Sequence, residues 1–157
     1  MQLSIDFRIT GTGWAECTLR DTSASCTVTA SYLSDALRHL VLAGTAVLSN
    51  FSRVTFSFEE EPGAFRWVIT SPRVNETLLQ ILEFESAYDE KPDAQGRLLF
   101  STTCLPITFA AAVSAAANAV LSYLGEQGYA KKWSEHPFPA EQLRELDRLL
   151  KREVHRA

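Results

Sequence analysis

The chain is poor in the residues that most often bind metals or act as nucleophiles. Its 157 residues include only three histidines and three cysteines. They are spread along the chain, at His39, His136, His155, Cys17, Cys26 and Cys104. No two of them have the close spacing of a zinc site, so we expect no metal and no cofactor.

Cysteine usage also bears on the compartment. The number of cysteines is odd, and no leader with a basic start and an apolar centre precedes Cys17. Both features argue against a disulfide framework. We therefore expect a cytoplasmic protein whose cysteines are small buried residues rather than redox or catalytic groups.

Motifs of the common catalytic sites are missing too. The chain has no GxSxG, GxxxxGKS/T or HExxH segment. The run from Gly11 to Gly13 has Glu16 where a dinucleotide-binding loop needs its third glycine, and it is better explained as a hairpin turn. The sequence therefore names no catalytic residue, and it favours a non-enzymatic protein over an enzyme.

Positive charge is scarce for a protein that binds nucleic acids. The chain has 15 basic and 19 acidic residues, a net charge of -4, whereas nucleic-acid binding comes mainly from Lys and Arg on phosphates. The charge balance argues against a nucleic-acid partner and favours a basic protein instead.

One long segment, residues 105–124, is free of charged side chains. Its length suits a membrane span, but alanine dominates it and Ser114 and Asn118 interrupt it. Because alanine gives little drive for insertion, we expect a buried helix and no membrane association.

What the chain does contain is a regular series of strand and helix patterns. Apolar and polar residues alternate with the strand period in residues 3–9, 14–20, 26–30, 53–59, 65–70, 77–85 and 97–104. Helical spacing marks residues 31–50 and 106–124 and a final helix that begins at Pro139 or Ala140, with an irregular connection over 129–138. We predict one α+β domain over 1–157, with an antiparallel sheet of about six or seven strands and helices packed on one face. The strands form groups of three and four on either side of the first helix.

The helix predicted over residues 31–50 organises the rest. Leu33 and Leu37 belong to its apolar stripe, and Ser31 or Ser34 is placed to cap its first turn.

Another face of this helix carries Tyr32, Asp35 and His39 at spacings of three and four. Asp35 could orient the His39 imidazole, with Tyr32 as a donor, to make a small acid–base or ligand site. A solvated helix face is the alternative, since no nucleophile accompanies these residues.

A second candidate site surrounds the turn after the fourth strand. Glu59, Glu60 and Glu61 lead into that turn, and Arg66 and Trp67 follow it. Three glutamates at a solvated edge are the simplest explanation, and a surface for a basic partner is the alternative. Arg66 is expected to pair with Glu59 or Glu60 across the hairpin, or to reach a ligand.

The three tryptophans, Trp14, Trp67 and Trp133, are expected to be core residues or interface anchors. One that is exposed on the outer surface would mark a partner site, because interfaces are rich in tryptophan.

The segments GTGWAE (11–16), SYLSDAL (31–37) and EEPGAFRW (60–67) resemble those of a group of small, acidic, uncharacterised bacterial proteins. The size, acidity and α+β layout are also similar to immunity proteins that neutralise bacterial toxins. The resemblance implies a non-enzymatic protein-binding module, with toxin neutralisation as its specific form. The alternatives are a small-ligand protein or enzyme with its site at the start of the first helix, and a homo-oligomer formed through a strand edge or the alanine-rich helix.

Overall fold

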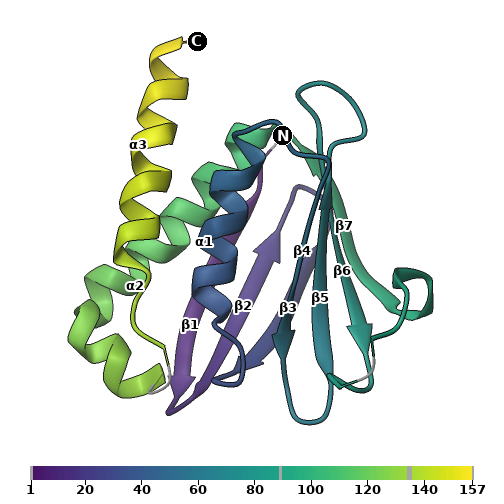
Figure 1. Cartoon of the computed structure of the whole chain (residues 1–157), viewed down its shortest axis with the longest axis vertical. Helices are drawn as coiled ribbons and strands as arrows, with labels where there is room; N and C mark the ends of the chain where they lie inside the picture. The colour runs from purple at the N-terminus through teal and green to yellow at the C-terminus, as the bar shows by residue number, and fades with distance from the viewer. Residues whose placement is uncertain (1, 89, 134–135, 157) are drawn as a thin grey trace.

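The computed structural model describes residues 2–88, 90–133 and 136–156, and it has an α+β fold with two antiparallel sheets and three α-helices (Figure 1). The first sheet contains β1 (Ser4–Gly11), β2 (Trp14–Arg20) and β3 (Ser25–Ser31), in that order. Alternate side chains of these strands enter the core, among them Phe7, Cys17 and Val28, because successive residues of a strand point to opposite faces.

The second sheet contains four strands in sequence order, β4 (Arg53–Glu59), β5 (Ala64–Thr70), β6 (Thr77–Phe84) and β7 (Arg97–Cys104). A short 3-10 helix, η1 (Asp93–Gln95), precedes β7. The core face of this sheet carries large apolar side chains, which include Phe58, Trp67, Ile81 and Phe100. The predicted strands are all present, in the predicted groups of three and four.

A single sheet of six or seven strands is not confirmed, because β3 and β4 do not form a ladder. Side chains join them instead. The Ser31 hydroxyl donates to the Glu59 carbonyl at 2.9 Å, and the Glu59 N–H donates to Ser34 Oγ at 3.1 Å. These hydroxyls satisfy backbone groups that a neighbouring strand would otherwise bind. The chain therefore begins a second sheet after the first helix.

The two sheets also meet near the other end of β3. The turn between β2 and β3 reaches β7, where the Thr102 hydroxyl lies near the Asp21 carboxylate. The pKa of Asp21 is lowered to about 2 by the N–H of Ser23, by that hydroxyl and by the N–H of Ala24. Strand β3 thus contacts both edge strands of the second sheet, β4 and β7.

The helices lie together on one side of the molecule (Figure 1). Helix α1 (Ala36–Val47) contacts α2 (Pro106–Trp133), α3 (Ala140–Arg156) and β4, and α2 also packs on β1. Leu37 and Leu40 of α1 are fully buried, as is Leu146 of α3. The amphipathic stripes predicted from the sequence are therefore the surfaces through which the helices pack.

Helix α1 is shorter than predicted at both ends. It begins at Ala36 because Ser31 closes β3 and the hydroxyls of Ser31 and Ser34 bind Glu59 instead of capping the helix. Asp35 takes the N-cap position without a side-chain cap hydrogen bond. Leu33, predicted to face the core, lies before the helix and is 38% exposed.

Helix α2 is longer than predicted and is broken within its length. Gly125 has φ 69° and ψ 170°, a conformation that glycine adopts easily, and the helix then resumes as far as Trp133. Tyr129 and Trp133 are fully buried, so packing keeps this part helical where an irregular connection was predicted. Of that predicted connection, residues 134–135 lie outside the described part of the chain.

By length and composition, α2 could cross a membrane, as its mean hydropathy is 1.6 over an 18-residue window. The buried core helix of a globular protein has the same character, and α2 packs against α1, α3 and β1.

Candidate functional site

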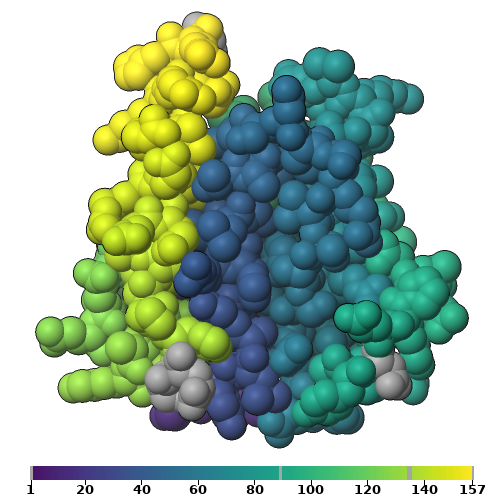
Figure 2. All heavy atoms as spheres, viewed as in Figure 1, coloured from purple at the N-terminus to yellow at the C-terminus, as the bar shows by residue number. Residues whose placement is uncertain are grey.

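Three connections come together at the lower end of the molecule in Figure 1: the β1–β2 turn, the loop between β3 and α1, and the β4–β5 turn. The Tyr32 N–H donates to the Gly13 carbonyl at 2.9 Å, which joins the first two connections. The Ser31 hydroxyl reaches Glu59, which joins the second to the third. At the lower edge of Figure 2, the chain near residue 30 adjoins the chain near residue 60.

Large apolar side chains are exposed on this end. Trp14 is 42% exposed, Tyr32 39% and Leu33 38%. Trp14 pairs with Ser31 in the β2–β3 register, directly before Tyr32. The Tyr32 ring lies over Gly13, where a Cβ would stand 2.9 Å from Tyr32 Cδ1, so a side chain at this position would displace the ring. The fold thus holds Trp14 and Tyr32 around the Gly13 turn, and the exposed Leu33 follows Tyr32 in the chain.

Carboxylates border the apolar groups on the side of β4. Glu16 lies opposite Thr29 in the β2–β3 register, and the Thr29 hydroxyl donates to the Glu60 carboxylate. Glu61 follows in the exposed turn. We call the surface made by Trp14, Glu16, Tyr32, Leu33, Glu60 and Glu61 the acidic–aromatic end.

Basic residues border the other side of this surface. The Gly13 N–H donates to the Lys132 carbonyl at 2.7 Å, and both Lys131 and Lys132 are exposed at the end of α2. Negative charge is therefore concentrated toward the β4–β5 turn rather than spread evenly.

Trp67 does not share a surface with the three glutamates. It is fully buried, stacked on Phe56 with ring centroids 5.4 Å apart and tilted against Phe58 at 5.0 Å. Trp67 therefore belongs to the core, as does Trp133, whereas Trp14 is the exposed tryptophan.

Arg66 lies on the outer face of the second sheet and pairs with neither Glu59 nor Glu60. Its Nη1 donates to the Asp93 carboxylate at 2.9 Å and to the Lys91 carbonyl at 2.7 Å. Its guanidinium carbon also lies 4.1 Å from the centroid of the Phe84 ring. The pairing prediction was wrong because a loop distant in sequence brings Asp93 over the strand.

Tyr32, Asp35 and His39, predicted to share a helix face, contact different neighbours. Tyr32 lies before the helix against Gly13, and the His39 ring stacks on Phe56 with centroids 6.0 Å apart. Asp35 Oδ2 is 3.6 Å from Nδ1 of His136. Burial lowers the pKa of His39, and the nearby Asp35 carboxylate only partly offsets this.

A buried polar region lies beneath this loop. Asp35 Oδ1 and the Tyr129 hydroxyl are buried, and neither has a hydrogen-bond partner within the described ranges. Burial and the Asp35 charge raise the pKa of Tyr129. The Trp133 indole N–H donates to the Ser34 carbonyl at 3.3 Å, which anchors α2 to the same loop. Sequence reasoning missed His136 and Tyr129 because they lie about a hundred residues further along the chain.

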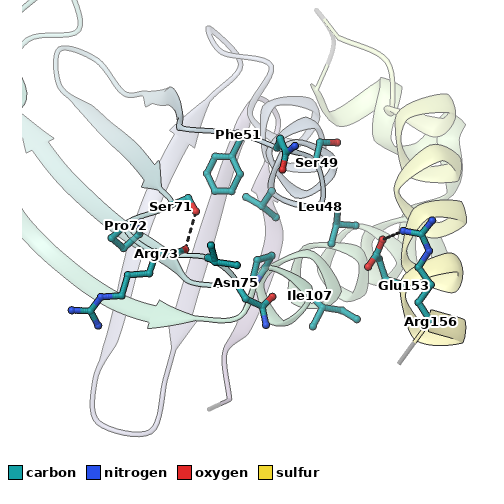
Figure 3. A pocket seen from close by; sticks show the side chains of 14 residues that line it. Leu48, Ser49, Phe51, Ser71, Pro72, Arg73, Asn75, Ile107, Glu153 and Arg156 are labelled. Atoms are coloured by element: carbon teal, nitrogen blue, oxygen red, sulfur yellow. Dashed lines mark hydrogen bonds and ion pairs between the residues drawn. The ribbon is translucent and has the colours of Figure 1, made fainter.

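A sizeable hollow lies at the other end of the molecule. A groove of about 950 Å³ runs between the end of α1, the β5–β6 loop, the start of α2 and the end of α3, and it opens between α3 and the β5–β6 loop at the top of Figure 2. Figure 3 shows Leu48, Phe51 and Ile107 on its walls, whereas Arg73 extends away from it. None of the residues singled out from the sequence lines this groove.

Groups suited to metal or thiol chemistry are sparse. No cluster of three His, Cys, Asp or Glu side chains that could hold a metal ion occurs among residues 2–88, 90–133 and 136–156. All three cysteines are free thiols. Burial raises the pKa of Cys17, and it raises the pKa of Cys104 to about 11, so these thiols are not activated nucleophiles.

Comparison of the chain with protein-family models, curated protein sequences and solved structures gave no significant match.

Proposed function

We propose that this chain is a non-enzymatic protein-binding module that docks a basic protein surface on its acidic–aromatic end. The observation that carries the proposal is the exposure of Trp14, Tyr32 and Leu33 together, next to Glu60 and Glu61. Protein interfaces combine desolvated aromatic anchors with a charged rim in this manner. Neutralisation of a basic toxin is the form of this activity suggested by the likeness in size, acidity and α+β layout to immunity proteins.

The two kinds of group have separate roles in this proposal. The aromatic side chains supply the apolar contact, which governs how slowly the complex dissociates. The glutamates attract a basic partner before contact, an effect that added salt weakens. Mutation of the aromatics should therefore raise the dissociation rate, and mutation of the glutamates should lower the association rate.

Affinity capture from the native cell extract tests the proposal, with the intact chain as bait at low salt. A basic protein should bind the native chain, and it should be lost with both Trp14→Ala/Tyr32→Ala and Glu60→Gln/Glu61→Gln. The matched control is Tyr88→Ala/Tyr123→Ala, which removes two aromatics that are 79% and 87% exposed elsewhere. Equal recovery with all of these baits, or no basic protein in any eluate, would count against the proposal.

A small-ligand site at the start of α1 is the second candidate. It is favoured by the buried Asp35 Oδ1 and Tyr129 hydroxyl, which lack partners in the described part of the chain, since such atoms usually bind a water or another group. Thermal-shift screening of small polar ligands tests this. A hit whose stabilising effect disappears in Asp35→Asn would support the site, and a hit unaffected by that variant would locate binding elsewhere.

A further inference from the structure

The two sheets have four edges, and most are protected. The edge of β1 is covered by α2, which packs on it, and Asp6 and Arg8 place charges along the strand. The β3 and β4 edges contact each other, and β4 begins with Arg53 and ends with Glu59. Proteins protect sheet edges with packed elements and charged residues, because unpaired backbone groups there recruit other strands.

The edge formed by β7 has less of this protection, and its one charged residue is Arg97 at its start. No backbone hydrogen bond joins it to a strand other than β6 within the described ranges. Apart from β6, it contacts β3, and its Thr102 lies near Asp21 in the turn between β2 and β3. From Leu98 to Cys104 the strand reads LLFSTTC, with no charged residue and no proline. In an edge strand, every second residue points its backbone N–H and C=O away from the neighbouring strand. On β7 these groups point away from β6.

Exposed leucines flank this edge. Leu98, at the start of β7, is 52% exposed, and Leu105, just past its end, is 47% exposed. Leu98 lies opposite Leu82, next to the small apolar cluster of Val68, Leu82 and Phe84 on the outer face. The register shift at Leu99 places both Leu98 and Leu105 on the outer face, although they are seven residues apart. An antiparallel twofold pairing of β7 centred on Thr102 would bring Leu98 near Leu105 of the partner subunit at each end of the new ladder.

We propose that β7 pairs antiparallel with β7 of a second copy of this chain, joining two four-stranded sheets into one across a twofold axis. The new ladder satisfies the outward backbone groups, and the leucines at both ends cover each other. No like charges meet, because the strand is neutral between Leu98 and Cys104. An unrelated extended peptide would satisfy the backbone but would not supply the reciprocal leucines.

Sedimentation velocity over a wide range of concentrations tests the proposal. The native chain should approach twice its monomer mass of 17.5 kDa. Leu98→Lys/Leu105→Lys should weaken dimerisation by roughly tenfold or more, because the twofold axis places the new charges close together. Ser101→Lys, at an exposed central position, is a second variant should the double change disturb folding, which circular dichroism would show.

Two control variants separate this edge from other surfaces. Val74→Lys and Tyr123→Lys add charge at residues that are 98% and 87% exposed on the β5–β6 loop and on α2, and both should leave the dimer unchanged. In the native dimer, outward amides of β7 should exchange slowly with solvent, and in the lysine variants rapidly. A monomer at all concentrations, or a dimer that Tyr123→Lys dissociates and Leu98→Lys/Leu105→Lys does not, would refute the proposal.

Discussion

The Arg66 guanidinium donates a 2.9 Å hydrogen bond to Asp93, which joins the outer face of β5 to η1. The second oxygen of Asp93 accepts a bond of 2.7 Å from Arg53. Burial on its own would raise the pKa of Asp93, but the hydrogen bonds from the two arginines outweigh it and lower the pKa below 3.8. One carboxylate thus fastens the loop between β6 and β7 to two strands.

Replacement of Asp93 by Asn should lower the free energy of unfolding near pH 7 by about 1 kcal/mol, since these pairs are partly exposed and surface pairs contribute little. A carboxyl group whose pKa is lowered in the folded state stabilises the protein above its unfolded pKa and loses this effect as pH falls. Urea unfolding should therefore separate Asp93→Asn from the native chain at neutral pH, and the difference should shrink as pH falls below 3.8 and through the lowered folded-state pKa.

Asp6→Asn is the matched control for that experiment. Its pair with Arg8 at 3.0 Å is more exposed, so its removal should change stability less. A stability deficit of Asp93→Asn that stayed the same at low pH would show that the carboxylate charge is not the cause.

Gly44 of α1 lies where the three helices meet. A Cβ built there would stand 3.2 Å from Leu146 Cδ2 and 3.3 Å from Val113 Cγ1, and both of those side chains are fully buried. Gly44→Val should lower the free energy of unfolding by about 2 to 3 kcal/mol through overpacking. Gly44→Ala should lower the free energy of unfolding less than Gly44→Val, because its single methyl group clashes less with Leu146 and Val113. The higher helix propensity of alanine, about 1 kcal/mol, offsets much of that smaller loss.

Chemical denaturation of these Gly44 variants gives the comparison directly. Gly128→Ala in the last part of α2 is the control, because its Cβ would approach Leu124 Cβ only to 3.4 Å, an ordinary contact. If Gly44→Val were as stable as the native chain, the three helices would not pack as closely as the structure shows.

His39 should make stability depend on pH in the mildly acidic range. Burial lowers its pKa from 6.5 in the folded state, with Asp35 and Glu59 opposing the shift and Arg38 and His136 adding to it. The unfolded chain therefore binds a proton first as pH falls, so stability is complete above 6.5 and declines below it. His39→Gln should flatten this decline.

Guanidinium unfolding between about pH 7.5 and pH 5 measures the slope that linkage predicts. The control is His155→Gln, which removes an exposed histidine near the end of α3. The prediction fails if native protein and His39→Gln lose stability in parallel over this range.

Much of the local structure could be predicted from the sequence because it depends on nearby residues. The alternation of Val54, Phe56 and Phe58 with polar residues predicts β4, whichever strand it pairs with. The helical spacing of leucines predicts α3 in the same way. Predictions failed where a distant partner decided the outcome. Ser31 belongs to β3 rather than to the first helix, because its hydroxyl bonds to Glu59. Helix α2 resumes after Gly125 because the rings of Tyr129 and Trp133 are buried.

The candidate surface shows the same division. The sequence alone shows the acidic run from Glu59 to Glu61. It also supports the expectation that an exposed tryptophan would mark a partner site. That Trp14 is the exposed tryptophan, and that Tyr32 and Leu33 join it, followed from the β2–β3 register and the Gly13 contact. Leu33 was missed because its helical spacing suggested burial.

By itself, the sequence determined the α+β class, the seven strands in groups of three and four, and the acidic character of the turn after β4. These features follow from side-chain periodicity and charge, which are properties of short segments. Tertiary structure alone decided that there are two sheets rather than one, that Arg66 binds Asp93, and that Asp35 meets His136. Each of these outcomes depends on which of several long-range contacts has the lowest free energy. The pattern of residues in a short segment does not contain that information.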